Sequence, residues 1–176
     1  PEAVVQSIDV PTIYEVPLRM HKQNLDGVLL EKLGLEADQQ PDLTEWEAFV
    51  ERIKNPKSVV DIALVGKYTE LPDAYKSINE SFIHAGAMND SKVKVRYVKA
   101  EKVNDQSAAE LFEGVSGIFV APGSGSRGVD GKIAAVKYAR ENNIPFFGVG
   151  LGMHCAIVEF ARTVLGLEDA ASAELD

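Results

Sequence analysis

Three glycine-containing turns carry the residue types that could do chemistry. They read VGKYTELPDAY at 65–75, VAPGSGSRGVDGK at 120–132 and FGVGLGM at 147–153. In the first, Lys67, Tyr68 and Asp73 could line a pocket, although a loop between a strand and a helix is more often a plain connection. In the second, glycines on both sides of Ser124 could expose backbone N–H groups to an anion or an oxyanion, or simply form a flexible turn.

The third turn admits three interpretations: a dinucleotide cradle, a nucleophile elbow and a tight turn. A dinucleotide fingerprint that starts at Gly148 needs a small third residue for close helix packing, and Met153 stands there. A nucleophile elbow projects the side chain of its middle residue into the site from a strained backbone. That middle residue is Gly150, which has no side chain.

The elements that must position these turns alternate in type along residues 57–176. Short apolar strands are expected near 59–65, 93–98, 117–121 and 145–149, and helical segments near 73–86, 107–114, 131–143 and 151–166 separate or follow them. This order indicates βαβ units and a parallel sheet covered by helices on both faces. Ligands bind such sheets at the carboxyl ends of the strands, where the three turns lie. We therefore expect the second and third turns to be adjacent at one sheet edge.

The first 56 residues show a different pattern, with two modest helices. One carries four apolar residues on a single face: Leu25, Val28, Leu29 and Leu33. The other opens with a cap signal from Asp42 and Thr44, and its apolar residues are Trp46, Phe49, Val50 and Ile53. Residues 1–56 are thus expected to precede the α/β core as a separate, helical segment.

Composition limits the classes of function. The formal net charge of −9 and pI near 4.9 disfavour a nucleic-acid partner, whose phosphates would be repelled. A single cysteine, Cys155, excludes a disulfide framework and a multi-cysteine metal site, so no metal is expected. No apolar run reaches membrane-spanning length, and the expected location is the cytoplasm, with no membrane partner.

The chain closely resembles CTP synthase over nearly its whole length. The resemblance rests on TIYEVPLRM, DIALVGKYTELPDAYKSINES, the run GIFVAPGSGSRGVDGKIAAVKYARENNIPFFGVGLGM and IVEFARTVLGLEDAASAELD. It implies the end of the synthetase region and a helical linker at 1–56, and the N-terminal part of a class I glutamine amidotransferase domain, with a flavodoxin-like parallel sheet, at 57–176. In this family ATP phosphorylates UTP, and ammonia released from glutamine displaces the phosphate to give CTP.

The resemblance also assigns site residues by position. The family's elbow motif falls on 148–154, which places its nucleophilic cysteine at Gly150 and its substrate-binding stretch at Leu151, Gly152, Met153 and His154. The Leu151 N–H is expected to be one oxyanion donor. The family's G-G-F-G loop falls on 122–125, which makes Gly123 the second donor, and Ser124 replaces the loop phenylalanine. Glu174 falls at the glutamate that binds the amino group of glutamine.

This chain is expected to be inactive by itself. Glycine at position 150 cannot attack the γ-amide, and no histidine follows His154 in the sequence. Cys155 lies five residues past Gly150, which turns it roughly 140° away on a helix, so a buried thiol is expected. His21 and His84 are interpreted as ordinary surface or helix residues.

The expected ligand is L-glutamine, and the expected partner is the synthetase domain, which binds UTP and ATP, in a family homotetramer. No cofactor is expected in this chain, because the resemblance places ATP and magnesium in the synthetase domain. The alternative is a non-catalytic glutamine-binding or interdomain-coupling module. A dehydrogenase-type nucleotide binder comes third.

Overall fold

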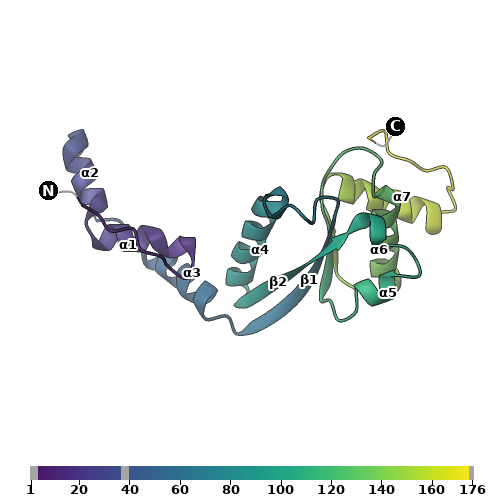
Figure 1. Cartoon of the computed structure of the whole chain (residues 1–176), viewed down its shortest axis with the longest axis horizontal. Coiled ribbons are helices and arrows are strands. Elements are labelled where there is room, and N and C mark those ends of the chain that lie inside the picture. The colour runs from purple at the N-terminus through teal and green to yellow at the C-terminus, as the bar shows by residue number, and fades with distance from the viewer. Residues whose placement is uncertain (1–3, 37–39, 175–176) are drawn as a thin grey trace. The chain divides into compact units, whose positions relative to one another are not determined.

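A computed structural model of the chain describes residues 4–36 and 40–174. Two compact units are distinguished: one comprises the residues up to Ser58 together with Ile83–Lys92, and the other comprises Val59–Phe82 and the residues from Val93 onward. The helices of the first part are α1 (Val16–Lys22), α2 (Leu25–Leu33) and α3 (Thr44–Lys54), with a 3₁₀ turn η1 (Ile13–Glu15) (Figure 1). The elements that follow are β1 (Ser58–Gly66), η2 (Pro72–Tyr75), α4 (Lys76–Met88), β2 (Ser91–Lys99), η3 (Ala100–Lys102), α5 (Ala108–Leu111), β3 (Gly117–Val120), α6 (Val129–Glu141), β4 (Phe146–Gly148) and α7 (Leu151–Thr163).

The four strands form one parallel sheet in the order β2-β1-β3-β4. Ile62 in β1 is in register with Gly117 in β3, and Ile118 in β3 with Phe146 in β4. The predicted strands and the parallel α/β fold are confirmed. The carboxyl ends of β1, β3 and β4 consequently meet at one edge, where the three glycine-containing turns begin.

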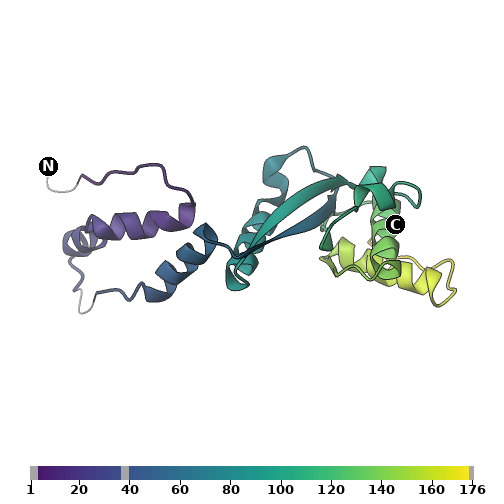
Figure 2. The ribbon, with the colours of Figure 1, turned by 90° about the horizontal axis from the view of Figure 1, so that it is seen from below.

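Side chains alternate between the two faces of the sheet, as strand geometry requires. Ala63 and Val65 of β1 join one cluster with Leu151 of α7, and side chains of α5 and α6 complete that cluster. Leu64 faces the other side and packs in a second cluster with Phe119, against which Phe82 of α4 packs. Helices therefore cover both faces, and α6 and α7 lie side by side in both views (Figures 1 and 2).

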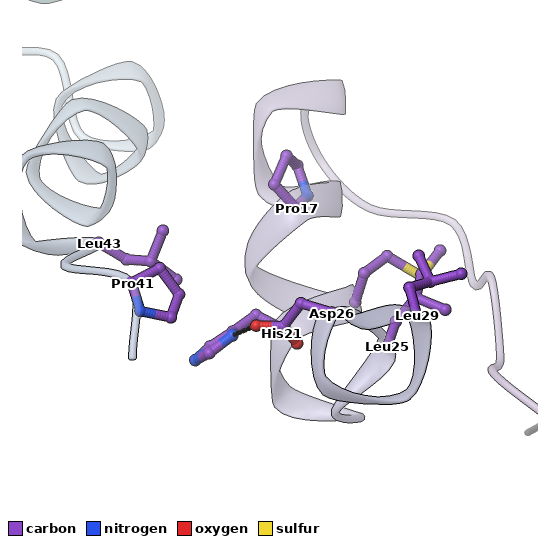
Figure 3. Close-up of a pocket in the computed structure, with 8 residues that line it drawn as sticks. Pro17, His21, Leu25, Asp26, Leu29, Pro41 and Leu43 are labelled. Carbon is purple, nitrogen blue, oxygen red and sulfur yellow. Dashed lines mark hydrogen bonds and ion pairs between the residues drawn. The ribbon is translucent and has the colours of Figure 1, made fainter. Parts of the chain in front are cut away.

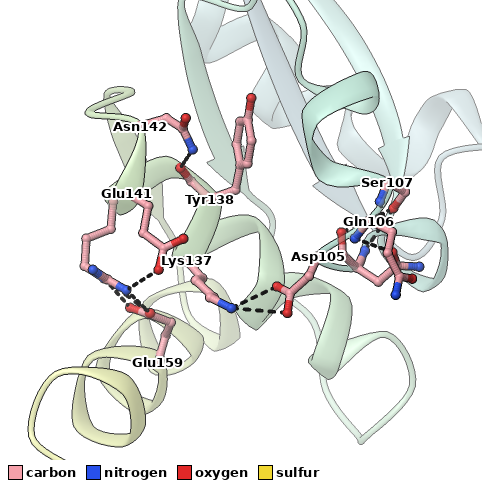
Figure 4. A network of polar contacts seen from close by, with 10 residues as sticks. Asp105, Gln106, Ser107, Lys137, Tyr138, Glu141, Asn142 and Glu159 are labelled. Atoms are coloured by element: carbon pink, nitrogen blue, oxygen red, sulfur yellow. Dashed lines mark hydrogen bonds and ion pairs between the residues drawn. The ribbon is translucent and has the colours of Figure 1, made fainter.

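A polar network connects α6 to its neighbours (Figure 4). Arg140 donates to both carboxylate oxygens of Glu159 in α7, at N···O distances of 2.8–3.2 Å, and Glu159 is 1% exposed. Lys137, one turn earlier, donates to Asp105 at 3.1 Å in the loop before α5. These ion pairs fix α6 above the sheet, and α6 follows directly on the second glycine-containing turn.

Two helices of the first unit, α2 and α3, form where the sequence predicts them, whereas α1 was not predicted. The N-cap of α3 is Leu43, which makes no side-chain cap hydrogen bond, but the Oδ1 of Asp42 just before it accepts a hydrogen bond from the Thr44 N–H at 3.0 Å. The expected apolar face of α2 is not buried, since Leu29 is 50% and Leu33 68% exposed. The helix itself is predicted correctly, but α2 has no buried residue.

An aromatic cluster holds η1 against α3. The Tyr14 ring contacts Trp46, Phe49 and His84 at centroid distances of 5.1–6.0 Å, and the Trp46 indole N–H donates to the Tyr14 carbonyl at 2.8 Å. His84 also hydrogen-bonds the Tyr14 hydroxyl. This packing supports the interpretation of His84 as an ordinary helix residue.

The α5 helix is shorter than the sequence pattern indicates. It ends at Leu111, and Gly114 takes a positive φ of 72° three residues later. The C-cap of the helix is Phe112, and the positive φ of Gly114 then turns the chain toward β3. Within 4–36 and 40–174, no helix is long and apolar enough to cross a membrane.

Candidate functional site

The turn between β4 and α7 uses its three glycines for two different purposes. A Cβ on Gly148 would lie 2.6 Å from the backbone of Gly152, and a Cβ on Gly152 would overlap the Val120 carbonyl oxygen. Both positions therefore require glycine because α7 packs directly on the strand ends. Gly150 meets no such obstacle, since a Cβ there would lie 3.5 Å from the Pro122 Cβ, an ordinary contact distance.

Gly150 nevertheless keeps a conformation typical of a strained elbow. Its φ of +53° and ψ of −118° lie in a region that residues with side chains rarely adopt. Its Cβ direction faces the Pro122 loop, which is where an elbow side chain would enter the site. The backbone thus has the shape of a nucleophile elbow without a nucleophile.

The loop from Pro122 to Gly128 lies against this elbow. The Val149 N–H donates to the Val120 carbonyl at 3.2 Å, which joins the two turns where β3 and β4 end. Gly125 and Gly128 have positive φ values of 74° and 77°, and Gly123 has 152°. The expected adjacency of the second and third turns at one sheet edge is confirmed.

Backbone N–H groups on both sides of Gly150 could act as donors to a ligand. Within the described ranges, the N–H groups of Gly123 and Leu151 make no hydrogen bond, and Gly123 is exposed to solvent. Leu151 is also the first residue of α7, where the helix dipole favours negative charge. Two such donors flanking an elbow are suited to hold a carbonyl oxygen or an oxyanion.

Two buried lysines support the loop from inside. Lys132 of α6 is fully buried and donates from Nζ to the carbonyl oxygens of Ala121 at 2.7 Å and Pro122 at 3.4 Å. Lys67, 6% exposed, donates to the Ser124 carbonyl. Sequence reasoning singled out Lys67 only as a possible pocket residue and missed Lys132, because a lysine on an amphipathic helix normally indicates a solvent-facing position.

Residues near the C-terminus approach the first turns of α7. The His154 Nδ1 lies 2.7 Å from the Ser172 hydroxyl and 3.8 Å from a carboxylate oxygen of Glu174. Glu174 is thus near the helix that carries the predicted substrate-binding stretch, while Met153 is 47% exposed on that helix. Ser172 was not anticipated from the sequence, and its contact with His154 is the signal that identifies it.

The other residues of the first turn form the outer part of the site. The Arg127 guanidinium lies over the Tyr68 ring at 5.2 Å and pairs with Glu101 at 2.5 Å. A hydrogen bond with Tyr68 and the Glu101 charge raise the pKa of Arg127. Asp73, which the sequence analysis grouped with Lys67 and Tyr68, is exposed in η2. Tyr68 is therefore held by Arg127 of the second turn.

Cys155 is buried and belongs to the core cluster that α6 and α7 share, as expected from its helical position. Burial raises the pKa of its thiol, so it stays protonated and unreactive at neutral pH.

His21 pairs with Asp26 at 2.7 Å beside a cavity of about 270 Å³ in the first unit (Figure 3). In the described part of the chain, no group of three His, Cys, Asp or Glu side chains could hold a metal ion.

Comparisons with known proteins agree on one family. Residues 70–174 match the model of the class-I glutamine amidotransferases. The CTP synthase of Cytophaga hutchinsonii is 58% identical over 99% of this chain and 32% of that protein, and the enzyme of Desulfitobacterium hafniense is 53% identical over 99% and 33%. A solved structure, the glutaminase domain of Trypanosoma brucei CTPS with bound acivicin, is 43% identical with a TM-score of 0.61, over 66% of this chain and 46% of that one. The chain spans about a third of the length of these curated relatives.

Proposed function

Because the chain belongs to the class-I glutamine amidotransferase family, we propose that residues 57–176 are the N-terminal part of the glutamine amidotransferase domain of a CTP synthase and bind L-glutamine. The observation that carries the proposal is the pair of N–H groups of Gly123 and Leu151 on either side of the Gly150 elbow. Similarity to CTP synthases along nearly the whole chain supports the same conclusion.

Glutamine would lie along the start of α7. Its side-chain amide oxygen would accept from the N–H groups of Gly123 and Leu151, and the backbone from Gly152 to His154 would border its aliphatic part. The Glu174 carboxylate would receive its ammonium group. Each exposed polar contact of this kind contributes only about 0.5–1.5 kcal/mol, so the expected Kd is millimolar or weaker.

The complete enzyme would aminate UTP to CTP with ATP and with ammonia from glutamine. Residues 1–56 would be the end of the synthetase region and the linker. The synthetase domain would be the partner of the amidotransferase domain, would hold ATP and magnesium, and would make the contacts of a homotetramer in the cytoplasm. No step in the described part of this chain is assigned to a metal, since its residues gather no metal-ligand group.

This chain would bind glutamine without hydrolysing it. Hydrolysis needs a nucleophile at position 150 and a base to activate it, and the chain has glycine there. The conformation of Gly150 also favours a second candidate function, a non-catalytic glutamine-binding or interdomain-coupling module, because the elbow shape persists where the reactive side chain is gone.

The experiment is a glutamine titration of the ¹⁵N-labelled chain together with an ammonia-release assay. The proposal expects the resonances of the Gly123 and Leu151 N–H groups to shift with millimolar glutamine, and ammonia to stay at background. D-glutamine is the matched control, because its ammonium group would point away from Glu174. Shifts confined to residues outside both turns, or turnover by the unmodified chain, would contradict the proposal.

A further inference from the structure

Lys132 is an unusual residue for the interior of a domain. It is 0% exposed, and among the described residues its Nζ hydrogen-bonds backbone carbonyls and no carboxylate. Lysine is almost never buried fully without a partner, and burial lowers the pKa of its ammonium group. The hydrogen bonds of Nζ to the Ala121 and Pro122 carbonyls are thus what compensates for a costly burial.

The two accepting carbonyls belong to consecutive peptide units of the glycine-containing loop. The Pro122 carbonyl shares its peptide plane with the Gly123 N–H, and no cis peptide bond occurs among the described residues. In a trans peptide the C=O and N–H point in opposite directions. A hydrogen bond that holds the Pro122 carbonyl toward the interior therefore turns the Gly123 N–H outward, toward the elbow.

The loop needs such a restraint because glycine does not supply one. Gly123 and Gly125 have few steric limits on φ and ψ, and the loop is exposed from Pro122 to Arg127. A Cβ on Gly123 would lie 3.7 Å from the Lys132 Nζ, so the Lys132 amine lies directly behind Gly123. Lys67 lies on the same side and holds the next carbonyl, that of Ser124.

We propose that Lys132 is a positioning residue that orients the Pro122–Gly123 peptide so that the Gly123 N–H faces the amide oxygen of bound glutamine. The inference rests on the proposed function for the identity of the ligand. Lys132 does not touch the ligand, because the peptide unit lies between them. Its contribution is to keep one oxyanion donor in place before glutamine arrives, which reduces the ordering that binding requires.

The test compares NMR spectra of the whole 176-residue chain with those of Lys132→Met, which fills the same space without a donor, and Lys132→Gln, which keeps an N–H donor on a shorter side chain. Lys137→Met is the matched control on the same helix, where the amine pairs with Asp105 away from the loop (Figure 4). Val136→Ala, in the core beside α6, controls for lost stability alone.

Without ligand, Lys132→Met should shift the Pro122 carbonyl carbon and broaden the Gly123 N–H, while Lys132→Gln should restore part of both. With glutamine, Lys132→Met should weaken binding by about five- to tenfold, as expected for the loss of one well-placed hydrogen bond. Lys137→Met and Val136→Ala should leave the loop resonances and the glutamine Kd unchanged. A merely structural role would give Val136→Ala and Lys132→Met the same loop spectrum at equal loss of thermal stability, and that result would overturn the inference.

A measurement on the unmodified chain applies even if Lys132→Met does not fold. Residual dipolar couplings of the Pro122–Gly123 peptide should fit a Pro122 carbonyl that points toward the Lys132 Nζ and a Gly123 N–H that points away from it, and couplings that fit the opposite orientation would overturn the inference. If glutamine shifts no resonance of the unmodified chain, the proposed function fails. The spectra without ligand would still decide separately whether Lys132 orients the peptide.

Discussion

At the scale of single residues, the three glycines before and in the first turn of α7 have two different roles. Two of them allow close packing, and the third occupies the position of a reactive side chain. Gly148 and Gly152 are required because a side chain at either position would collide with backbone, whereas a side chain at Gly150 would have room. Only the positive φ of Gly150 opposes substitution there. The elbow is consequently maintained by its neighbours, and position 150 can vary without loss of the fold.

Alanine at these positions should have sharply different effects on stability. We expect Gly150→Ala to cost about 1–2 kcal/mol, the penalty for a side chain at positive φ. Gly152→Ala should cost at least about 3 kcal/mol, because the new Cβ would overlap the Val120 carbonyl. Urea unfolding followed by circular dichroism measures both. Equal midpoints for the two variants would contradict the packing argument.

Cysteine at position 150 should not create a glutaminase in this chain. Gly150→Cys places a thiol in the elbow, but a thiol without a base stays mostly protonated near neutral pH. His154 is already engaged, with its Nδ1 at 2.7 Å from the Ser172 hydroxyl. Ammonia release by the variant should match the unmodified chain, with Gly150→Ser as control. Release above background that thiol alkylation abolishes would refute this expectation.

At the scale of elements, α6 connects the glycine-containing loop to α7. It begins directly after the loop, carries Lys132 beneath it, and is joined to α7 through Arg140 and Glu159. The Glu159 carboxylate is buried, and among the described residues its ion-pair partner is Arg140. The relative position of the two turns therefore depends on the packing of α6 against α7.

Removal of one partner of the Arg140–Glu159 ion pair should destabilise the fold more than removal of both partners. Arg140→Met leaves a buried carboxylate without a partner and should cost about 3–5 kcal/mol. The double variant Arg140→Met with Glu159→Met should recover a large part of that loss, because no uncompensated charge remains. Thermal unfolding of the single and double variants is the measurement. A double variant that is less stable than Arg140→Met would show that the pair stabilises the fold by itself.

At the scale of the whole chain, ligand selectivity distinguishes the candidate functions. The expected contacts are those for glutamine, and Met153 breaks the dinucleotide fingerprint. In calorimetric titrations, we expect weak binding of glutamine, at millimolar Kd or above, and no tighter binding of NAD, UTP or ATP. Micromolar NAD binding would revive the dinucleotide interpretation, and micromolar glutamine binding would indicate a dedicated glutamine sensor.

The sequence predicted the fold well because strand and helix patterns differ clearly after residue 57. Parallel order alone brings the turns after β3 and β4 to one edge, so their adjacency also followed from the sequence. The positions of Lys132 and Ser172 could not be predicted in this way, because each acts through a contact with a residue distant along the chain. The exposure of the apolar face of α2 was not anticipated either, since periodicity shows a helix face but not what covers it.

The steric freedom at Gly150 has a genetic consequence. A glycine codon can become a cysteine codon through one base change, and the surrounding turn has room for the added Cβ, although the positive φ remains strained for a side chain. Selection on a CTP synthase lineage could thus remove or restore the nucleophile in a single mutational step, without compensating changes at Gly148, Gly152 or the Pro122 loop. The backbone of the turn would stay the same whether the nucleophile is lost or restored.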